Sequence, residues 1–315
     1  MEQKFDIVAI GESLIELSTD LKLSCAECLH KYYGGDALAT AIAALRAGSR
    51  VGFITKVGDD AFKDYLLDSW NAEGLDISQV KLTEEQNGLY FIARPTIQEK
   101  EFEYYRKKIA PSKLSIDDIS EEYIKSAKMI YTSGITQTLS MSAREAVSYA
   151  FRIAKQNGIQ TAYDPNYSLR TSTPEEAREY FNNIIEDVDI LFMSAKYDTV
   201  NILELDSAEN IIKKLWDMGV SIVVIKASEK CGYFVGANGS IKFVEFFAKN
   251  VIDTTCSGDA FNGGFLHAIT HGYSPVEAAR IGSIVAGLQC GKIGAIKSLP
   301  YADDIFKIYN GGCSV

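Results

Sequence analysis

The chain has 315 residues, of which 47% are hydrophobic and 23% charged, a composition that predicts a soluble, globular protein with a large core. Its formal net charge of −10 argues against nucleic acid and anionic membranes as main partners, because both bind basic surfaces. The sequence has neither an apolar run of about eighteen residues nor a start typical of a signal peptide, so we expect a cytoplasmic protein.

Strand and helix patterns alternate from the N-terminus. Residues 5–11 are a short apolar run, which predicts a strand, and an Ala-rich helix pattern follows and stops at Gly48. Residues 51–58 predict another strand, and residues 60–74 predict a helix that ends at Gly74. Strand followed by helix is therefore the repeating unit.

Residues 87–110 interrupt this alternation. Apolar residues alternate over 89–93, the chain turns, and the alternation returns at Phe102 and Tyr104, which predicts a β-hairpin. With residues from about 12–34, this hairpin is expected to form a small antiparallel sheet that projects from the core as a lid. No linker separates two domains, so we predict a single domain over all 315 residues with this lid inserted in it.

The strand and helix units return in the second half of the chain. The predicted strands are 128–134, 159–164, 188–194 and 220–228, and the predicted helices are 140–157, 174–186 and 207–218. These strands are continuous apolar runs, which favours an α/β fold with a doubly wound, mostly parallel sheet and helices on both faces. Ligands of such sheets bind beyond the carboxyl ends of the strands, which makes candidates of Gly11, Ser133, Asp164, Ser194, Lys226 and Asp253.

The cysteines are spread too thinly for a disulfide scaffold, and we expect reduced thiols at Cys25, Cys28, Cys231, Cys256, Cys290 and Cys313. The spacing of Cys25 and Cys28 is that of a zinc-ligand pair. No second pair completes a tetrahedral site, so no protein-ligated metal is predicted.

The stretch DTTCSGDAF, residues 253–261, precedes a predicted helix that starts near Gly258. The unpaired N–H groups of a helix start bind anions, and small residues let a phosphate approach the backbone. Asp259 lies in the first turn, where it either complements the helix dipole or accepts the proton of a hydroxyl that attacks the phosphate.

This stretch resembles the second signature of the ribokinase-like (PfkB) carbohydrate kinases, which reads approximately DTxGAGDxF. The family's first signature, two glycines followed by an Ala-rich helix, is matched by GGDALATAIAALRAG at 34–48, and the similarity continues over nearly the whole chain. The resemblance implies a Rossmann-like kinase with a β lid that forms a homodimer through the lids. It also implies ATP and Mg²⁺ as cosubstrates, Asp259 as the base, and an anion hole formed by Cys256, Ser257, Gly258 and Asp259.

Two residues of the second signature depart from the family pattern, since Cys256 replaces a glycine and Ser257 an alanine. If the backbone at Cys256 has a positive φ, its side chain costs about 1 kcal/mol. The thiol is either a redox-sensitive group at a helix start or a small buried side chain that only packs.

The nucleotide side matches the family less well. Ser194 and Tyr197 stand where many members have Asn and Glu, and the KxGxxG motif keeps only its Lys and last Gly. The residues carried over for ATP are Ser194, Lys226, Ser228, Gly232 and Gly294. Gly294 lies in a segment that resembles the family's closing GA, near the nucleotide site and the site of a monovalent cation such as K⁺.

On the sugar side, Gly34 and Gly35 let the backbone approach a polyol, and Asp36 offers acceptors for its hydroxyls or caps the helix that follows. EYYRKKIAPSKLS, starting at residue 103, resembles 2-keto-3-deoxygluconate kinases. That resemblance implies a substrate pocket containing Tyr90, Tyr104, Arg106, Ile135 and Arg170.

Arg106 is suited to pair with the carboxylate of a sugar acid. YDPNYSLR, at 163–170, departs from the subgroup because Ser168 stands where its Arg is expected. The predicted function is therefore ATP-dependent phosphorylation of a terminal hydroxyl of 2-keto-3-deoxygluconate or a related ketose. A fructokinase or other ketohexose kinase and a catalytically silent sugar-binding homologue are the alternatives.

Overall fold

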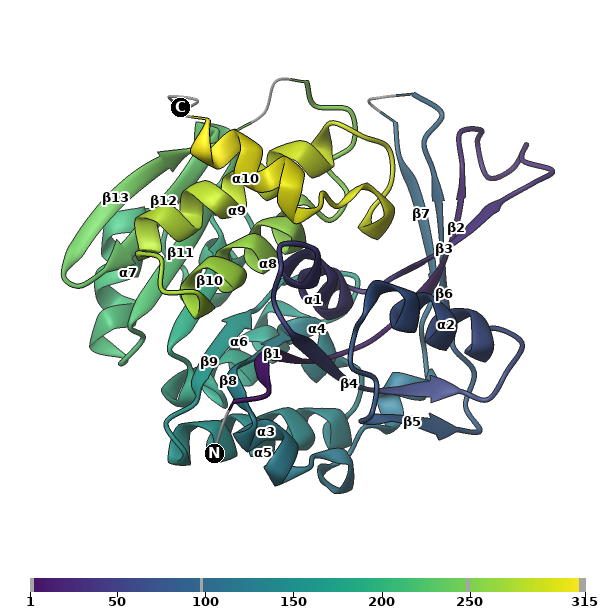
Figure 1. Cartoon of the computed structure of the whole chain (residues 1–315), viewed down its shortest axis with the longest axis horizontal. Coiled ribbons are helices and arrows are strands. Elements are labelled where there is room, and N and C mark those ends of the chain that lie inside the picture. The colour runs from purple at the N-terminus through teal and green to yellow at the C-terminus, as the bar shows by residue number, and fades with distance from the viewer. Residues whose placement is uncertain (1–2, 97–98, 248–249, 312–315) are drawn as a thin grey trace.

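The computed structural model describes residues 3–96, 99–247 and 250–311 (Figure 1). In this part of the chain a nine-stranded sheet has the order β13-β12-β11-β10-β9-β8-β1-β4-β5. All neighbouring strands are parallel except at one edge, where β11, β12 and β13 pair antiparallel. The bounds are β1 Phe5–Ile10, β4 Val51–Gly58, β5 Val80–Thr83, β8 Ala127–Ser133, β9 Gln160–Asp164, β10 Ile190–Ser194, β11 Ile222–Ala227, β12 Gly232–Ala237 and β13 Ser240–Glu245.

Helices cover both faces of this sheet, as predicted (Figure 1). Alternate residues of β1 show the two faces, because Ile7 packs into one core with α1, α2, α8, α9 and α10, whereas Val8 packs into another with α3, α5, α6 and α7. The bounds are α1 Asp36–Arg46, α2 Lys63–Glu73, α3 Glu121–Lys125, α4 Gly134–Thr138, α5 Met141–Gln156, α6 Pro174–Asn182, α7 Ala208–Asp217, α8 Ser257–Thr270, α9 Pro275–Cys290 and α10 Ala302–Asn310. The doubly wound α/β fold is confirmed.

A separate four-stranded sheet, which we call the lid sheet, projects from the core (Figure 1). Its strands are β2 Leu14–Thr19, β3 His30–Gly34, β6 Gly88–Ala93 and β7 Glu101–Tyr105, in the order β3-β2-β6-β7. The β2–β3 and β6–β7 pairs are antiparallel, and the two hairpins join through the parallel pair β2–β6. Residues 97 and 98 of the segment expected to form the lid lie outside the described residues.

Glycines end two helices where the sequence predicts it. Gly48 and Gly74 have φ of +114° and +86°, a backbone that favours glycine and stops the helix. The helix expected near Gly258 is α8, which begins one residue earlier at Ser257.

Two further expectations concern membranes and cysteines. Within the described part of the chain, none of the helices has the length and apolar character that crossing a bilayer requires. The five described cysteines are free thiols, and Cys313 lies outside the described residues.

Candidate active site

A cleft of about 910 Å³ lies between the carboxyl ends of the central strands and the lid sheet. All eight residues predicted for the sugar side line it, together with two residues of the α8 turn. These ten residues are Gly34, Gly35, Asp36, Tyr90, Tyr104, Arg106, Ile135, Arg170, Cys256 and Asp259. Residues that are far apart in the sequence are thus brought together at the edge where α/β sheets bind ligands.

The turn before α8 has the geometry of an anion cradle. Cys256 is the N-cap residue, and its φ of +71° is the left-handed backbone conformation in which a side chain was expected to cost stability. Among the described residues, no backbone acceptor takes the N–H groups of Cys256, Gly258 and Asp259, whereas Ser257 donates its N–H to the Thr254 carbonyl at 3.2 Å. Three N–H groups are therefore available to an anion at this helix start.

The Asp259 carboxyl group is a strong proton acceptor for its position. Burial raises its pKa well above the usual range, and the neighbouring carboxylates Asp36 and Asp164 raise it further. Lys226 opposes these effects, and a Cβ built on Gly258 would lie 3.5 Å from Lys226 Nζ. The turn therefore combines a carboxyl group of raised pKa with a cation that faces the anion cradle.

Lys226 is anchored by buried partners. Its Nζ donates to Asp164 Oδ2 at the end of β9, and Asn262 of α8 donates to the same oxygen at 2.6 Å. Asp164 and Asp198 raise the pKa of Lys226 against the opposing effect of burial, so the ammonium keeps its charge. The lysine that the sequence assigned to the nucleotide thus lies beside the anion cradle.

Asp36 faces the cleft as the first residue of α1. Ser133 donates its hydroxyl to Asp36 Oδ2, and Asn166 Nδ2 lies 3.4 Å from the same atom. The alternative in which Asp36 caps α1 is wrong, because Gly35 is the N-cap residue and has no side chain. Gly35 has φ +125°, and a Cβ there would lie 2.4 Å from the Glu12 carbonyl oxygen, so only glycine fits.

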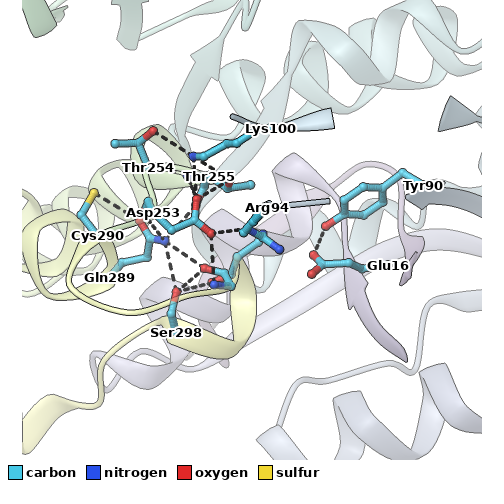
Figure 2. A network of polar contacts seen from close by, with 12 residues as sticks. Glu16, Tyr90, Arg94, Lys100, Asp253, Thr254, Thr255, Gln289, Cys290 and Ser298 are labelled. Carbon is cyan, nitrogen blue, oxygen red and sulfur yellow. Dashed lines mark hydrogen bonds and ion pairs between the residues drawn. The ribbon is translucent and has the colours of Figure 1, made fainter. Parts of the chain in front are cut away.

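The lid sheet contributes a stacked aromatic wall. The rings of Tyr90 and Tyr104 are 5.6 Å apart and nearly parallel, and the Tyr90 hydroxyl donates to Glu16 on β2 (Figure 2). The guanidinium groups of Arg106 and Arg170 lie 5.7 and 5.8 Å from the centre of the Tyr104 ring. Two cations therefore flank one aromatic ring in the cleft.

Arg106 forms an ion pair with Glu12, at 2.6 Å between Nη2 and Oε1. Glu12 is only 2% exposed, and burial raises its pKa to about 7 even though Arg106 opposes the shift. Among the described residues, Glu12 Oε2 and Asp36 Oδ1 are buried oxygens without a hydrogen-bond partner. Both residues line the cleft, so these oxygens are candidate acceptors for substrate hydroxyl groups.

None of the residues predicted for the nucleotide lines the cleft, Lys226 included. Ser228 is exposed, and Ser194 accepts the Tyr197 N–H at 3.0 Å. Gly232 packs against β13, because a Cβ there would lie 2.4 Å from the Phe243 ring. Gly294 donates its N–H to Asp253 Oδ2 at 3.1 Å, and its neighbour Ala295 lines the cleft.

Several polar residues of the site were not among the predicted site residues, and Glu12, Asn166 and Asn262 make the most direct contacts with predicted ones. Glu12 follows Gly11, a residue that the strand-end rule did select, so the same rule extended by one residue would have found it. Asn166 and Asn262 contact Asp36 and Asp164, respectively, across 130 and 98 positions of the chain. Asn166 lies in the YDPNYSLR stretch compared with the subgroup above, which was a local signal for it, whereas no local signal marks Asn262.

A metal ion has few protein ligands here. Within the described ranges, no three His, Cys, Asp or Glu side chains gather as metal ligands. Mg²⁺ in kinases is held largely by phosphates and water with one or two carboxylates. Asp164, which pairs with the Lys226 ammonium, and Asp198, which acts on its charge from nearby, are the candidate carboxylates, and burial followed by Asp164 raises the pKa of Asp198 to about 6.

The fold and the cleft define an α/β enzyme that combines an anion cradle, a proton acceptor and a lid over a polar pocket. The model of the pfkB family carbohydrate kinases matches residues 4–302. The chain therefore belongs to this family, and it is a phosphotransferase with an alcohol group as acceptor.

Two relatives and one solved structure illustrate the similarity. A 5-dehydro-2-deoxygluconokinase of Clostridium perfringens is 31% identical over an alignment of 313 positions that covers 96% of this chain and 92% of that protein. A 2-dehydro-3-deoxygluconokinase of Thermoproteus tenax is 31% identical over 304 residues, with 95% and 92% covered. The crystal structure of a putative ribokinase II from E. coli with ATP and Mg²⁺ has the same fold, with a TM-score of 0.88, 22% identity, and 97% and 99% of the two chains covered.

Proposed function

We propose that this sugar kinase transfers the γ-phosphate of ATP to a terminal hydroxyl of a dehydro-deoxygluconate. The substrate class is supported by the names of the relatives at 31% identity, which act on the 5-dehydro-2-deoxy or the 2-dehydro-3-deoxy acid. The observation that carries the proposal is the pairing, in one cleft, of a proton acceptor at an anion cradle with two arginines on the lid side.

Asp259 is the proposed base. Its raised pKa means that the Asp259 carboxylate binds a proton more tightly than an exposed aspartate does, which suits a proton acceptor. The N–H groups of Cys256, Gly258 and Asp259, with Lys226, would stabilise negative charge on the transferred phosphoryl group. ATP supplies that group, and Mg²⁺ would neutralise the charge of its phosphates.

Arg106 and Arg170 are the proposed partners of the substrate carboxylate. A protein of net charge −10 repels an anionic sugar unless local cations attract it, and both arginines line the cleft. Arg106 has guanidinium N–H groups beyond the one directed at Glu12, so it can hold a second carboxylate in the planar geometry that arginine favours. Arg170 is two residues beyond the position where the subgroup has its arginine.

The proposal includes the lid sheet as a cover that excludes water from the phosphoryl group, which prevents ATP hydrolysis. It also includes a homodimer formed through the outer faces of two lid sheets. Tyr105 on that face is 61% exposed, and its ring lies 5.7 Å from the partly buried Phe91 ring. A cytoplasmic location is part of the same proposal, because the enzyme would draw on the ATP of the cell.

The test is a coupled assay of ADP release with ATP, Mg²⁺ and a panel of 5-dehydro-2-deoxygluconate, 2-dehydro-3-deoxygluconate, fructose and ribose. We expect turnover to favour one of the two sugar acids. Asp259→Asn keeps the shape of the side chain but removes the proton acceptor, so its kcat should fall by roughly 10²- to 10⁴-fold. Asp68→Asn, an exposed position on α2, is the matched control and should retain full activity.

Each other outcome of this assay has a distinct meaning. A preference for fructose would keep Asp259 as the base and remove the carboxylate role of Arg106 and Arg170. Full activity of Asp259→Asn would overturn the assignment of the base. Sugar binding without ADP release from any member of the panel would make the chain a silent sugar-binding homologue.

A further inference from the structure

Four oxygen atoms converge on one buried amide nitrogen beneath the anion cradle (Figure 2). Gln289 Nε2 lies 2.8 Å from the Thr255 carbonyl oxygen, 3.1 Å from both the Gly294 carbonyl oxygen and Ser298 Oγ, and 3.4 Å from the Asp253 carbonyl oxygen. Gln289 is 0% exposed. An amide nitrogen has only two hydrogens, so these oxygens outnumber what it can donate.

This set of oxygens, which we call the oxygen cage, has the chemistry of a monovalent-cation site. Backbone carbonyl oxygens replace the hydration shell of K⁺ where proteins bind it. The cage contains three carbonyl oxygens and one hydroxyl, and it includes Gly294 in the segment whose resemblance implied such a cation. The Gln289 amide nitrogen already lies among these oxygens, so the cage has no room for an ion in addition to it.

The carboxylate next to the cage is held by two protein cations and by backbone N–H groups. Asp253 Oδ1 is 2.7 Å from Lys100 Nζ and accepts the Thr255 N–H at 3.0 Å, while Oδ2 is 2.6 Å from Arg94 Nε and accepts the Gly294 N–H. Asp253 is 1% exposed, and these donors hold its pKa at about 2 despite burial. Two cationic side chains from the β6–β7 hairpin thus supply the positive charge here (Figure 2).

We propose that Gln289, with Arg94 and Lys100, takes the place of a monovalent cation in this protein. The amide holds the cage oxygens together, and the two cations neutralise Asp253. The Thr255 carbonyl belongs to the residue just before Cys256, so the same contacts fix the direction of the N–H groups in the anion cradle. The kinase therefore needs no K⁺, and the cage becomes a K⁺ site only when the Gln289 side chain is shortened.

The first experiment measures melting temperatures without substrate, in KCl and in tetramethylammonium chloride at equal ionic strength. The Tm of the wild-type protein should be the same in both salts. Gln289→Ala leaves buried carbonyl oxygens without a donor, so its Tm in tetramethylammonium should fall by about 2–4 °C or more and recover in KCl. Gln137→Ala is the matched control, because Gln137 is also buried and hydrogen-bonded, and its loss should not depend on the salt.

The second experiment repeats the comparison with ADP release, and only this part rests on the proposed function. Wild-type kcat should not change between the salts, whereas K⁺ should raise the kcat of Gln289→Ala roughly tenfold. A wild-type Tm or kcat that rises with K⁺ overturns the proposal, and so does a Gln289→Ala protein that is indifferent to K⁺ in both assays. If no sugar of the panel is turned over, the melting temperatures still test the cage independently of the proposed function.

If Gln289→Ala does not fold, Gln289→Ser keeps a small polar group and is used in its place. Crystals of the variant soaked in Tl⁺, which substitutes for K⁺ and scatters X-rays anomalously, should show an ion bound to the Gly294 carbonyl oxygen. Wild-type crystals soaked in the same way should show none at that position. Thallium in the wild-type cage would contradict the proposal directly.

Discussion

The turn at the start of α8 contains residues of the candidate site and also a strained backbone at one of them, Cys256. Cys256 has φ +71°, where a side chain costs about 1 kcal/mol relative to glycine. We therefore predict that Cys256→Gly raises the free energy of unfolding by about 1 kcal/mol, measured by urea denaturation. Cys256→Ala retains a Cβ and is the matched control, which should show no such gain.

A second cysteine tests the same explanation outside the cleft. Cys231 also has a left-handed backbone, with φ +50°, but it is exposed and does not line the cleft. Cys231→Gly should give a similar gain in stability without a change in kcat. If neither glycine variant is more stable than its alanine counterpart, backbone strain does not explain the cost of these residues.

The surroundings of the Cys256 thiol disfavour its reactive form. Burial, and then the neighbouring Asp259 carboxylate, raise its pKa well above the usual range. The thiolate is the reactive form, so a raised pKa lowers reactivity toward oxidants. The surroundings favour the other alternative, in which Cys256 packs as a small, half-buried side chain against the core.

At the scale of the secondary-structure elements, α8 also carries a buried histidine at its far end. His267 is 4% exposed, its Nδ1 lies 2.9 Å from Ser49 Oγ, and its ring packs 5.7 Å from Phe306 of α10. Burial lowers its pKa from 6.5 to about 4, with a smaller contribution from His271. Protonation of His267 is therefore unfavourable in the folded state.

We predict that this histidine makes the protein less stable in acid. The unfolded chain binds the proton below pH 6.5 and the folded chain only near pH 4, so stability is complete above pH 6.5 and falls as the pH is lowered toward 4. The loss should reach roughly 3 kcal/mol. His267→Gln cannot be protonated, and the difference between its pH profile and that of the wild type isolates the effect, with the exposed His30→Gln as control.

The sequence predicted most elements of the fold because their patterns are local. The continuous apolar strands and the glycines that end helices do not depend on distant residues, and they appear where expected. The β12–β13 hairpin was not predicted, although Asn238 and Gly239, both with positive φ, form a turn typical of hairpins. The parallel pairing of β2 with β6 had no sequence signal, because it joins strands about 74 residues apart.

The residues of the candidate site that belong to sequence motifs could be predicted, and the others could not. The cleft residues taken from the two signatures and the lid meet in one place. The ion pairs of Asp253 with Lys100 and Arg94 and the oxygen cage around Gln289 were not predicted, since they depend on contacts between the lid, the α8 turn and α9. Such contacts follow from the assembled fold rather than from any segment alone.

At the scale of the whole molecule, the lid sheet is connected to the turn before α8. Lys100 and Arg94 lie in the β6–β7 hairpin, and both contact Asp253, three residues before the helix cap. The same hairpin carries Tyr104, and Arg106 follows directly after β7. One hairpin thus lines the cleft and also contacts the turn before α8, so the lid closure proposed above would act on the anion cradle through these ion pairs.

We predict a dimer that forms through the outer face of the lid sheet. Tyr105 and Phe91 form an apolar patch there, and β3 and β7 are edge strands whose outer sides are open to a partner. We expect light scattering after size exclusion to give twice the chain mass, and Tyr105→Glu to give a monomer, because a charge at the centre of an apolar interface is costly. Met141→Glu, at a residue 70% exposed on α5, is the control and should remain a dimer. A wild-type protein that is monomeric at every concentration, or a Tyr105→Glu dimer, would contradict assembly through the lid and leave the cleft chemistry unaffected.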